Sequence, residues 1–168
     1  MKTIVCVDNN WGIGSANQLL YSIPGDMKFF REKTTGKVVV MGLATFLSFP
    51  KQQPLKNRVN IVISNDDSFQ RDDVIICSSI DEALDKIKEY NSDDVYVIGG
   101  ASIYAQMIDY CDTAYITKVD ASRPADKFFP NLDEKENWVL TDVGEKLEHE
   151  GLVYKFCTYK NKTGGVNK

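Results

Sequence analysis

Short apolar runs rich in β-branched residues recur along the first two thirds of the chain. Runs that are apolar at every position, rather than at alternate ones, fit strands that are buried on both faces, as in a parallel sheet. The runs occupy residues 4–7, 38–41, 61–63, 74–76, 95–98 and 114–116. They predict a buried, mainly parallel central sheet.

Several of the gaps between these runs show helical periodicity. Residues 80–87 place apolar side chains at the i, i+3, i+4 and i+7 positions, and Ser79 with Glu82 makes a capping-box pattern at their start. A shorter pattern of the same kind covers residues 103–108. Strands that alternate with helices predict an α/β fold with a doubly wound sheet.

The last third of the chain has a different pattern. Residues 138–140 and 152–159 predict two further strands, separated by a charged loop. An antiparallel edge on a mainly parallel sheet is common, so the full prediction is an α/β, doubly wound, mainly parallel central sheet with an antiparallel C-terminal edge. We expect a single domain over residues 1–160, because no repeat or linker divides the chain. Residues 161–168 are polar and contain glycine, which predicts a flexible tail.

A helix is expected to begin at or beside Asp26, because a Pro-Gly pair directly precedes it. On that helix Asp26, Met27 and Phe30 share one face. A carboxylate among apolar side chains is costly to bury without a cationic or donor-rich partner, which suggests a binding role. The alternative is an ordinary first-turn residue that complements the helix dipole. The segment before it, residues 8–25, has the length of a functional loop such as a lid.

Two glycine segments invite a nucleotide interpretation. Gly99-Gly100 follows a predicted buried strand and opens a helix, so its backbone could approach a phosphate closely, or it could simply form a tight turn. Gly12-Ile13-Gly14 is a weak match to a dinucleotide motif, because the third glycine and the following helix are missing. Ligands of open α/β sheets bind beyond the carboxyl ends of the strands, and both segments follow predicted strands. This arrangement suits a nucleotide cofactor beside a small, donor-rich substrate.

Composition narrows the classes of function. The net charge of −4 gives no support for a nucleic-acid partner, and no apolar run approaches the ~20 residues that span a bilayer. Charge appears too early in the N-terminal sequence for a signal peptide, so we expect a cytoplasmic protein. The single histidine, His149, argues against a metal site or a histidine triad. The four cysteines are widely spaced, which argues against a disulfide framework.

The order and spacing of the motifs resemble the dihydrofolate reductase family, over residues 4–159. The matching segments are Gly12-Ile13-Gly14 with Asn17, Ile23-Pro24-Gly25-Asp26, Phe29-Phe30, Met41-Gly42 with Thr45-Phe46, Pro54-Leu55-Lys56-Asn57-Arg58, Val97-Ile98-Gly99-Gly100 with Ile103-Tyr104, Tyr115-Ile116-Thr117, and Asp126 with Phe128-Phe129-Pro130. The resemblance implies reduction of 7,8-dihydrofolate to 5,6,7,8-tetrahydrofolate by hydride transfer from NADPH. That activity supports one-carbon metabolism and thymidylate synthesis. The implied protein is a monomeric enzyme and an antifolate target.

The resemblance also assigns residues to roles. Asp26, Tyr21 and Thr117 are implied to be catalytic, with Asp26 accepting hydrogen bonds from the pterin and Thr117 orienting it. Arg58 is implied to grip the glutamate α-carboxylate of the substrate. The implied substrate-binding residues are Ile4, Cys6, Asp26, Met27, Phe30, Phe49, Arg58, Ile98 and Thr117. The implied cofactor-binding residues are Cys6, Ile13, Gly14, Asn17, Gly42, Leu43, Thr45, Ser64, Asn65, Ser78, Gly99, Gly100, Ala101, Ser102, Ile103 and Tyr104.

Three features depart from the family pattern. Tyr21 replaces a tryptophan that the family commonly has beside the pterin pocket. Leu43 replaces an arginine that meets the 2′-phosphate of NADPH, and the other matched phosphate-side positions, Ser64, Asn65, Ser78 and Ser102, carry no cation either. We therefore expect a weakened preference for NADPH over NADH, since charge-assisted hydrogen bonds are roughly twice as strong as neutral ones. Gln53 stands where the family has a second arginine, so Arg58 alone is expected to hold the substrate tail.

Two other functions fit parts of the pattern. One is the pyrimidine reductase of riboflavin synthesis, which would also use a nicotinamide cofactor but has no need of the Asp26–Phe30 face or of Arg58. The other is a non-catalytic nucleotide-binding module. Oxidation of the cofactor that depends on dihydrofolate separates the first interpretation from both alternatives.

Overall fold

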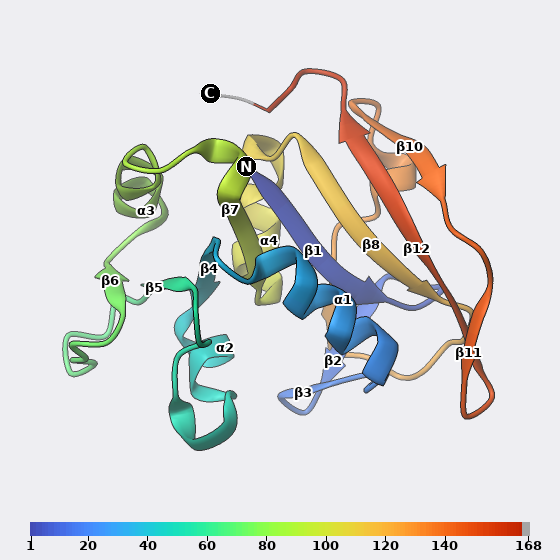
Figure 1. Ribbon diagram of the computed structural model, residues 1–168, viewed down its shortest axis with the longest axis horizontal. Helices are drawn as coiled ribbons and strands as arrows, with labels where there is room; N and C mark the ends of the chain where they lie inside the picture. The colour runs from blue at the N-terminus through green and yellow to red at the C-terminus, as the bar shows by residue number, and fades with distance from the viewer. Residues whose placement is uncertain (166–168) are drawn as a thin grey trace.

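The computed structural model describes residues 1–165, and over this range the chain forms a nine-stranded central sheet and a smaller three-stranded sheet (Figure 1). The main path of the central sheet runs β10-β12-β8-β1-β7-β4-β5-β6, with β11 added against β12. Its first six strands in chain order are β1 (Lys2–Val7), β4 (Val38–Gly42), β5 (Val59–Ile63), β6 (Ile75–Cys77), β7 (Val95–Gly99) and β8 (Thr113–Val119).

These six strands are the apolar runs of the sequence, and every pairing among them is parallel. Their carboxyl ends therefore lie at one edge of the sheet. The remaining strands, β10 (Trp138–Val143), β11 (Leu147–His149) and β12 (Leu152–Asn161), add an antiparallel edge through β12 and β8. The predicted mainly parallel sheet with an antiparallel C-terminal edge is confirmed.

Helices cover both faces of the sheet, as a doubly wound fold requires. Side chains of α3 (Ile80–Ile87) and α4 (Ala101–Met107) pack with Val38 and Val40, whereas side chains of α1 (Pro24–Thr34) and α2 (Leu43–Leu47) pack with Val39 and Met41. Neighbouring residues of β4 thus face opposite helical layers, which explains why the strand is apolar at every position. Short 3-10 helices complete the chain: η1 (Pro50–Gln52), η2 (Ser92–Asp94), η3 (Ile108–Tyr110) and η4 (Leu132–Glu134).

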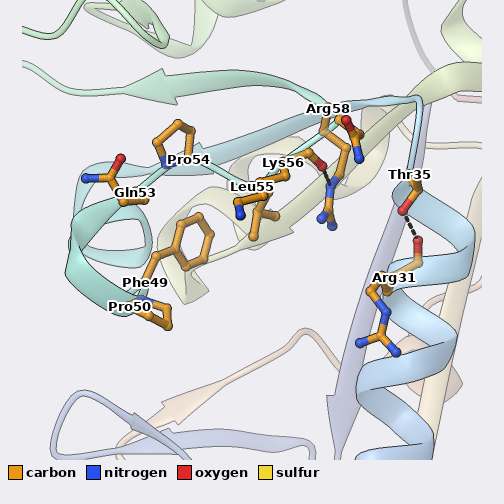
Figure 2. A pocket seen from close by; sticks show the side chains of 10 residues that line it. Arg31, Thr35, Phe49, Pro50, Gln53, Pro54, Leu55, Lys56 and Arg58 are labelled. Carbon is orange, nitrogen blue, oxygen red and sulfur yellow. Dashed lines mark hydrogen bonds between the residues drawn. The ribbon is translucent and has the colours of Figure 1, made fainter.

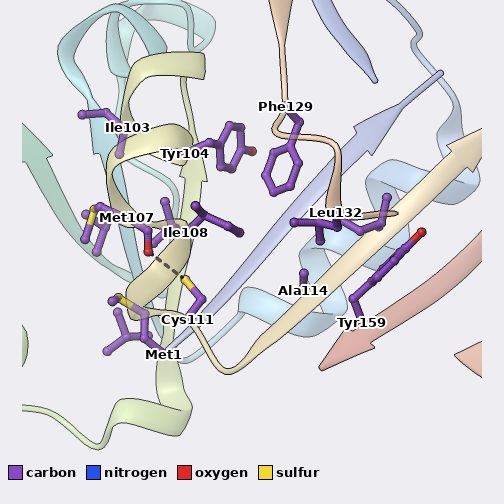
Figure 3. Close-up of a cluster of buried hydrophobic side chains, with 14 of the residues drawn as sticks. Met1, Ile103, Tyr104, Met107, Ile108, Cys111, Ala114, Phe129, Leu132 and Tyr159 are labelled. Atoms are coloured by element: carbon purple, nitrogen blue, oxygen red, sulfur yellow. Dashed lines mark hydrogen bonds between the residues drawn. The ribbon is translucent and has the colours of Figure 1, made fainter. Parts of the chain in front are cut away.

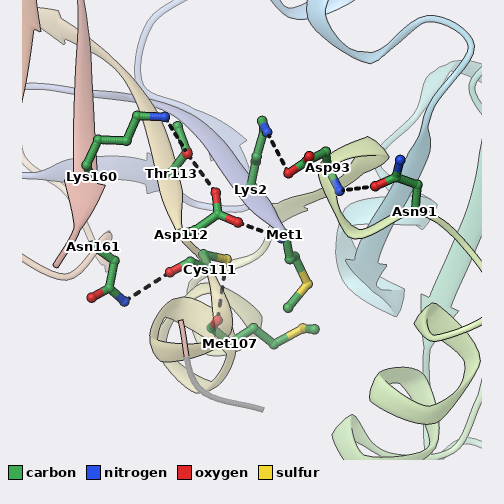
Figure 4. Close-up of polar contacts among 10 residues, drawn as sticks. All are labelled: Met1, Lys2, Asn91, Asp93, Met107, Cys111, Asp112, Thr113, Lys160 and Asn161. Atoms are coloured by element: carbon green, nitrogen blue, oxygen red, sulfur yellow. Dashed lines mark hydrogen bonds and ion pairs between the residues drawn. The ribbon is translucent and has the colours of Figure 1, made fainter. Parts of the chain in front are cut away.

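The larger core cluster joins α4 to the antiparallel edge of the sheet (Figure 3). Met107 of α4, Leu132 of η4 and Tyr159 of β12 are almost completely buried in it, although they are far apart in sequence. At the edge where β1 begins, polar contacts close the sheet (Figure 4). There the Met1 amino group pairs with Asp112 at 3.2 Å and Lys2 pairs with Asp93 at 3.5 Å.

The structure differs from the sequence-based prediction at three places. Residues 8–25 contain a hairpin of β2 (Gly12–Ser15) and β3 (Gln18–Leu19), and β2 also pairs with β9 (Lys127–Phe128). The charged loop before residue 152 contains β11. Finally, Asn161 belongs to β12 rather than to the predicted tail, because its buried side chain donates to the Cys111 carbonyl at 3.0 Å.

The last three residues of the predicted tail, 166–168, lie outside the described part of the chain. Between residues 1 and 165, no helix has both the length and the apolar character needed to cross a bilayer. The four cysteines are free thiols.

Candidate active site

The candidate site lies at the edge where the parallel strands end, and Asp26 is its one carboxylate on α1. Pro24 occupies the first turn of α1 and sets the start of the helix, so Asp26 falls in the same turn. The Thr117 hydroxyl, from the middle of β8, donates to Asp26 Oδ1 at 2.6 Å. A side chain on Gly25 would meet the hydroxyl of Tyr154, so glycine lets α1 approach the sheet closely enough for this bond. The pairing of Asp26 with Thr117 that the resemblance implied is therefore present.

The environment of Asp26 is apolar and contains only neutral donors. Burial raises the pKa of its carboxyl, and hydrogen bonding from Thr117 and from the Cys6 thiol only partly offsets burial. Cys6 lies beside Thr117 because the two residues are register partners in β1 and β8. Within residues 1–165 no lysine or arginine is among the groups that shift the pKa of Asp26. The site therefore presents a carboxylate whose charge is not balanced by the protein.

Four of the apolar side chains predicted to bind substrate belong to one core cluster. Ile4 is buried in β1, while Phe30, Phe49 and Ile98 are partly buried in the same cluster. Met27 of α1 is 54% exposed. Four of the predicted apolar residues thus lie in one cluster on the α1 face of the sheet, whereas Met27 is exposed.

A cavity of about 380 Å³ opens between α1 and the segment that follows α2 (Figure 2). Arg58 lies at one end of it, where its guanidinium donates to the Lys56 carbonyl at 2.9 Å and to the Thr34 hydroxyl at 3.0 Å. Burial and the nearby charge of Arg31 lower the pKa of Arg58. The complete lining is Arg31, Thr35, Phe49, Pro50, Gln53, Pro54, Leu55, Lys56, Asn57 and Arg58.

Arg31 was not found from the sequence, and it changes the expectation for the substrate tail. It projects from α1 toward the segment that carries Phe49 and Arg58 (Figure 2). The cavity therefore has two arginines rather than Arg58 alone. The helical spacing of Arg31 from Met27, one turn earlier on the same face, is the signal that could have identified it.

A glycine pair marks the next part of this edge. Gly99 and Gly100, joined by a cis peptide bond, lie where β7 ends, beside Thr45 of α2. A Cβ atom at Gly99 or Gly100 would come within 3.2 or 3.3 Å of the Thr45 hydroxyl, so the absence of side chains keeps this opening clear. In the described residues the Thr45 hydroxyl has no hydrogen-bond partner. Backbone N–H groups and a free hydroxyl around a side-chain-free opening fit the pyrophosphate of a nicotinamide dinucleotide.

The other predicted cofactor residues lie along the same edge. Tyr104 is buried and donates to the Ile4 carbonyl at 2.8 Å, which ties α4 to β1. Leu43, Ser64 and Ser78 follow three neighbouring parallel strands, because Gly42 pairs with Ile63 and Ile63 with Cys77. Asn65 also follows β5, and Ala101, Ser102 and Ile103 follow β7.

Hydrogen bonds connect residues 8–25 to the segment after β8. The Asp126 carboxylate accepts from the Ala16 amide at 3.0 Å, and the Asp126 amide donates to the Gly14 carbonyl at 3.0 Å. This arrangement sets β2, with Ile13 and Gly14, and the turn at Asn17 beside β9.

A second set of contacts holds residues 8–25 through Tyr21. Its hydroxyl donates to Asp8 Oδ2 at 3.1 Å, and the Arg123 guanidinium lies 4.4 Å from the centre of its ring. Asp8 also accepts from the Arg123, Gly12 and Asn10 amides. Burial acts to raise the pKa of Asp8, but these hydrogen bonds outweigh it and hold the pKa below its usual range. The Tyr21 hydroxyl is therefore directed at Asp8 and not at Asp26.

Asp8 and Arg123 could not be found by motif, because their contact depends on the approach of two distant loops. The one available signal was for Asp8, a carboxylate placed directly after a buried strand. No group of three metal-ligating side chains occurs between residues 1 and 165.

Comparison with known proteins agrees with this geometry. The sequence model described as dihydrofolate reductase matches residues 1–161. The dihydrofolate reductase of Bacillus subtilis is 34% identical over 161 residues, covering 95% of this chain and 93% of the relative, and that of Haemophilus influenzae is 35% identical over 147 residues, covering 88% and 89%.

The structural comparison leads to the same family. The solved structure of dihydrofolate reductase from Enterococcus faecalis, complexed with NADP(H) and RAB-propyl, superposes with a TM-score of 0.82 at 29% identity and covers 95% of both chains. Neither the pyrimidine reductase nor the non-catalytic module is favoured by these relatives. The chain belongs to the dihydrofolate reductase family.

Proposed function

We propose that Asp26 is the group on which this enzyme depends for the reduction of 7,8-dihydrofolate to 5,6,7,8-tetrahydrofolate with NADPH. The observation that carries the proposal is the 2.6 Å hydrogen bond from Thr117 to Asp26. It holds a carboxylate at the strand edge with neutral donors, so the charge of Asp26 remains available to a ligand. The pterin ring offers N–H and 2-amino donors that form short, charge-assisted hydrogen bonds with such a carboxylate.

Asp26 also acts on the acidity of the substrate. A negative charge close to the ring raises the affinity of the pterin N5 for a proton. Protonation at N5 makes the adjacent C6 carbon electron-poor, and NADPH, when bound, supplies the hydride that this carbon accepts. Dihydrofolate, NADPH and one proton give tetrahydrofolate and NADP⁺. Thr117 positions Asp26, and Tyr21 acts through Asp8 to hold the loop beside the ring.

Separate groups would hold the cofactor. Gly42, Thr45, Gly99, Gly100 and Ala101 would cradle its pyrophosphate by backbone N–H groups and a hydroxyl. Cys6, Ile13, Gly14, Asn17 and Tyr104 would border the nicotinamide, and the hairpin of β2 and β3 would exclude water from the reacting atoms. Preference for NADPH over NADH would be weakened, because Leu43, Ser64, Asn65, Ser78 and Ser102 are all uncharged.

The remaining assignments concern the substrate tail and the state of the protein. Arg58 and Arg31 would bind the glutamate carboxylates of dihydrofolate, since guanidinium groups match carboxylates in bidentate geometry. Ile4, Phe30, Phe49 and Ile98 would contact its aromatic part, with Met27 closing over it. Antifolate inhibitors would occupy the same pocket. The enzyme would act as a monomer in the cytoplasm.

The test is the loss of NADPH absorbance with dihydrofolate present, for wild type, Asp26→Asn and the control Asp109→Asn. Asp26→Asn keeps the shape and removes the charge, so kcat at neutral pH should fall by about 10²–10⁴-fold. Asp109→Asn removes an exposed carboxylate of η3 and should leave kcat unchanged. Turnover by Asp26→Asn at the wild-type rate would disprove the role of Asp26.

A further inference from the structure

If the cofactor binds as proposed, its adenosine end would lie over the ends of β5 and β6. Asp26 and Thr117 lie on the β1–β8 side of the sheet, and the opening at Gly99 and Gly100 lies between β7 and β4. A dinucleotide with its nicotinamide near Asp26 and its pyrophosphate at this opening would continue over β4, β5 and β6. Neighbouring strands are about 4.8 Å apart, so this stretch has the length of an adenosine. The placement rests on the proposed function.

A fixed carboxylate lies at that end of the sheet. Glu82, in the first turn of α3, accepts at Oε2 from the Ser78 amide at 2.7 Å and from the Ser78 hydroxyl at 2.5 Å. Ser78 is the residue directly after β6. These hydrogen bonds lower the pKa of Glu82, so the group is ionised at neutral pH. Among the described residues, none donates to Glu82 Oε1, which is free to accept from a ligand.

The position of Glu82 goes beyond helix capping. In a capping box its carboxylate would accept from the amide of the N-cap residue, Ser79. The Ser79 hydroxyl does cap α3, since it accepts from the Glu82 amide at 3.1 Å. The Glu82 carboxylate instead turns to Ser78, one residue earlier, and so toward the strand end.

We propose that Glu82 is a specificity-determining residue that lowers the preference of this enzyme for NADPH over NADH. Its free oxygen accepts a hydrogen bond from the ribose 2′-hydroxyl of NADH, as acidic residues do in other dinucleotide sites. It repels the 2′-phosphate of NADPH, and it occupies the two donors of Ser78 that a phosphate could otherwise use.

Lys86 and Arg71 do not cancel this charge. Lys86, one turn further along α3, pairs with Glu89 at 3.1 Å. Arg71 pairs with Asp73 at 2.6 Å and lies over the ring of Phe46. Both cations are therefore engaged by other carboxylates.

The first measurement compares kcat/KM for NADPH and NADH, with dihydrofolate, in wild type and Glu82→Gln. The amide keeps the shape of the side chain and removes its charge, so the NADPH/NADH ratio should rise about tenfold. Asp81→Asn is the matched control, because it removes a neighbouring exposed charge of the same turn that makes no hydrogen bond to Ser78. Its ratio should change by less than about twofold.

The second measurement needs no turnover. Titration calorimetry measures the affinities of adenosine 2′,5′-bisphosphate and of 5′-AMP. Because the two ligands differ only in the 2′-phosphate, the difference between the affinities reports the contribution of that group. Glu82→Gln should bind the bisphosphate about tenfold more tightly than wild type, with little gain for 5′-AMP.

The outcomes test the role of Glu82 and the proposed function separately. If dihydrofolate is reduced but Glu82→Gln leaves both the kinetic ratio and the bisphosphate affinity at wild-type values, the inference is wrong. It is also wrong if Asp81→Asn produces the same changes, because the effect would then belong to net charge. If neither cofactor is oxidised with dihydrofolate, the proposed function fails, and the calorimetry still judges Glu82.

Discussion

Burial raises the pKa of the Asp26 carboxyl in the folded protein, although neutral donors act against it. Folding then favours the protonated form. A group whose pKa is raised on folding contributes stability that is present below its unfolded value of about 3.9 and is lost as pH rises through the folded value. At neutral pH the ionised Asp26 therefore destabilises the ligand-free enzyme.

The Asp26→Asn variant should be more stable than wild type at neutral pH. The amide can still accept from Thr117 and removes the buried charge, so the gain should be about 1 kcal/mol, or roughly 3 °C in Tm. Thermal unfolding without ligands measures it, and the gain should disappear below about pH 4, where Asp26 is protonated in both states. A lower Tm for Asp26→Asn at neutral pH would contradict this account.

The two arginines of the tail cavity should affect substrate binding and not the chemical step. Arg58 is held in place by Lys56 and Thr34, so Arg58→Gln should raise KM for dihydrofolate by about 10–100-fold with kcat nearly unchanged. Exposed Arg31 should contribute less, about threefold in Arg31→Gln. Dihydropteroate, which lacks the glutamate, is the control substrate. If the variants impair it equally, the arginines do not act on the tail.

At the scale of single residues, the sequence identified those site residues that belong to a family motif. The family pattern identified Asp26 and Thr117, and the structure brings them together. The bond from Tyr21 to Asp8 and the approach of Arg31 to Arg58 were not predicted, because each joins side chains whose contact depends on how distant segments pack.

The position of α1 depends on one close approach, between Gly25 and the Tyr154 hydroxyl of β12. In Gly25→Ala the new methyl group would collide with that hydroxyl, displace the start of α1 and move Asp26. We expect kcat/KM to fall by about 10–100-fold, since small displacements of a catalytic group are costly. Tyr154→Phe removes the colliding atom, so the double variant should recover to within about threefold of Tyr154→Phe alone. Absence of recovery would exclude this contact as the cause.

Elements were predictable in proportion to their length and apolar content. Helix α3 carries a full amphipathic pattern with a cap, and β1, β4 and β7 are apolar throughout. The short strands β2, β3, β9 and β11 were missed. They have only two to four residues, too few to show a period, so their pairing comes from tertiary contacts.

At the scale of the whole molecule, the site is a product of strand order. The sheet places β1 and β8 on one side of β7, and β4, β5 and β6 on the other. Asp26, which would bind the substrate, and the proposed adenosine end therefore lie on opposite sides of the opening at Gly99 and Gly100. Apolar runs predicted parallel, doubly covered strands, but they do not encode which strands are neighbours.

The continuous sheet also predicts how the protein unfolds. Hydrogen bonding runs without a break from β10 to β6, so neither half can lose its strands without exposing the other, and residues 1–160 should unfold as one domain. Calorimetry without ligands should show one transition of about 120 kcal/mol, at roughly 0.7 kcal/mol per residue, with equal calorimetric and van't Hoff enthalpies. Val62→Ala in β5 and Leu132→Ala in η4 truncate fully buried side chains on opposite sides of the molecule. Each should lower the same Tm while leaving one transition. If Val62→Ala instead split off an early transition, the strands β4 to β6 would form a separate unit, and the single-domain prediction would fail.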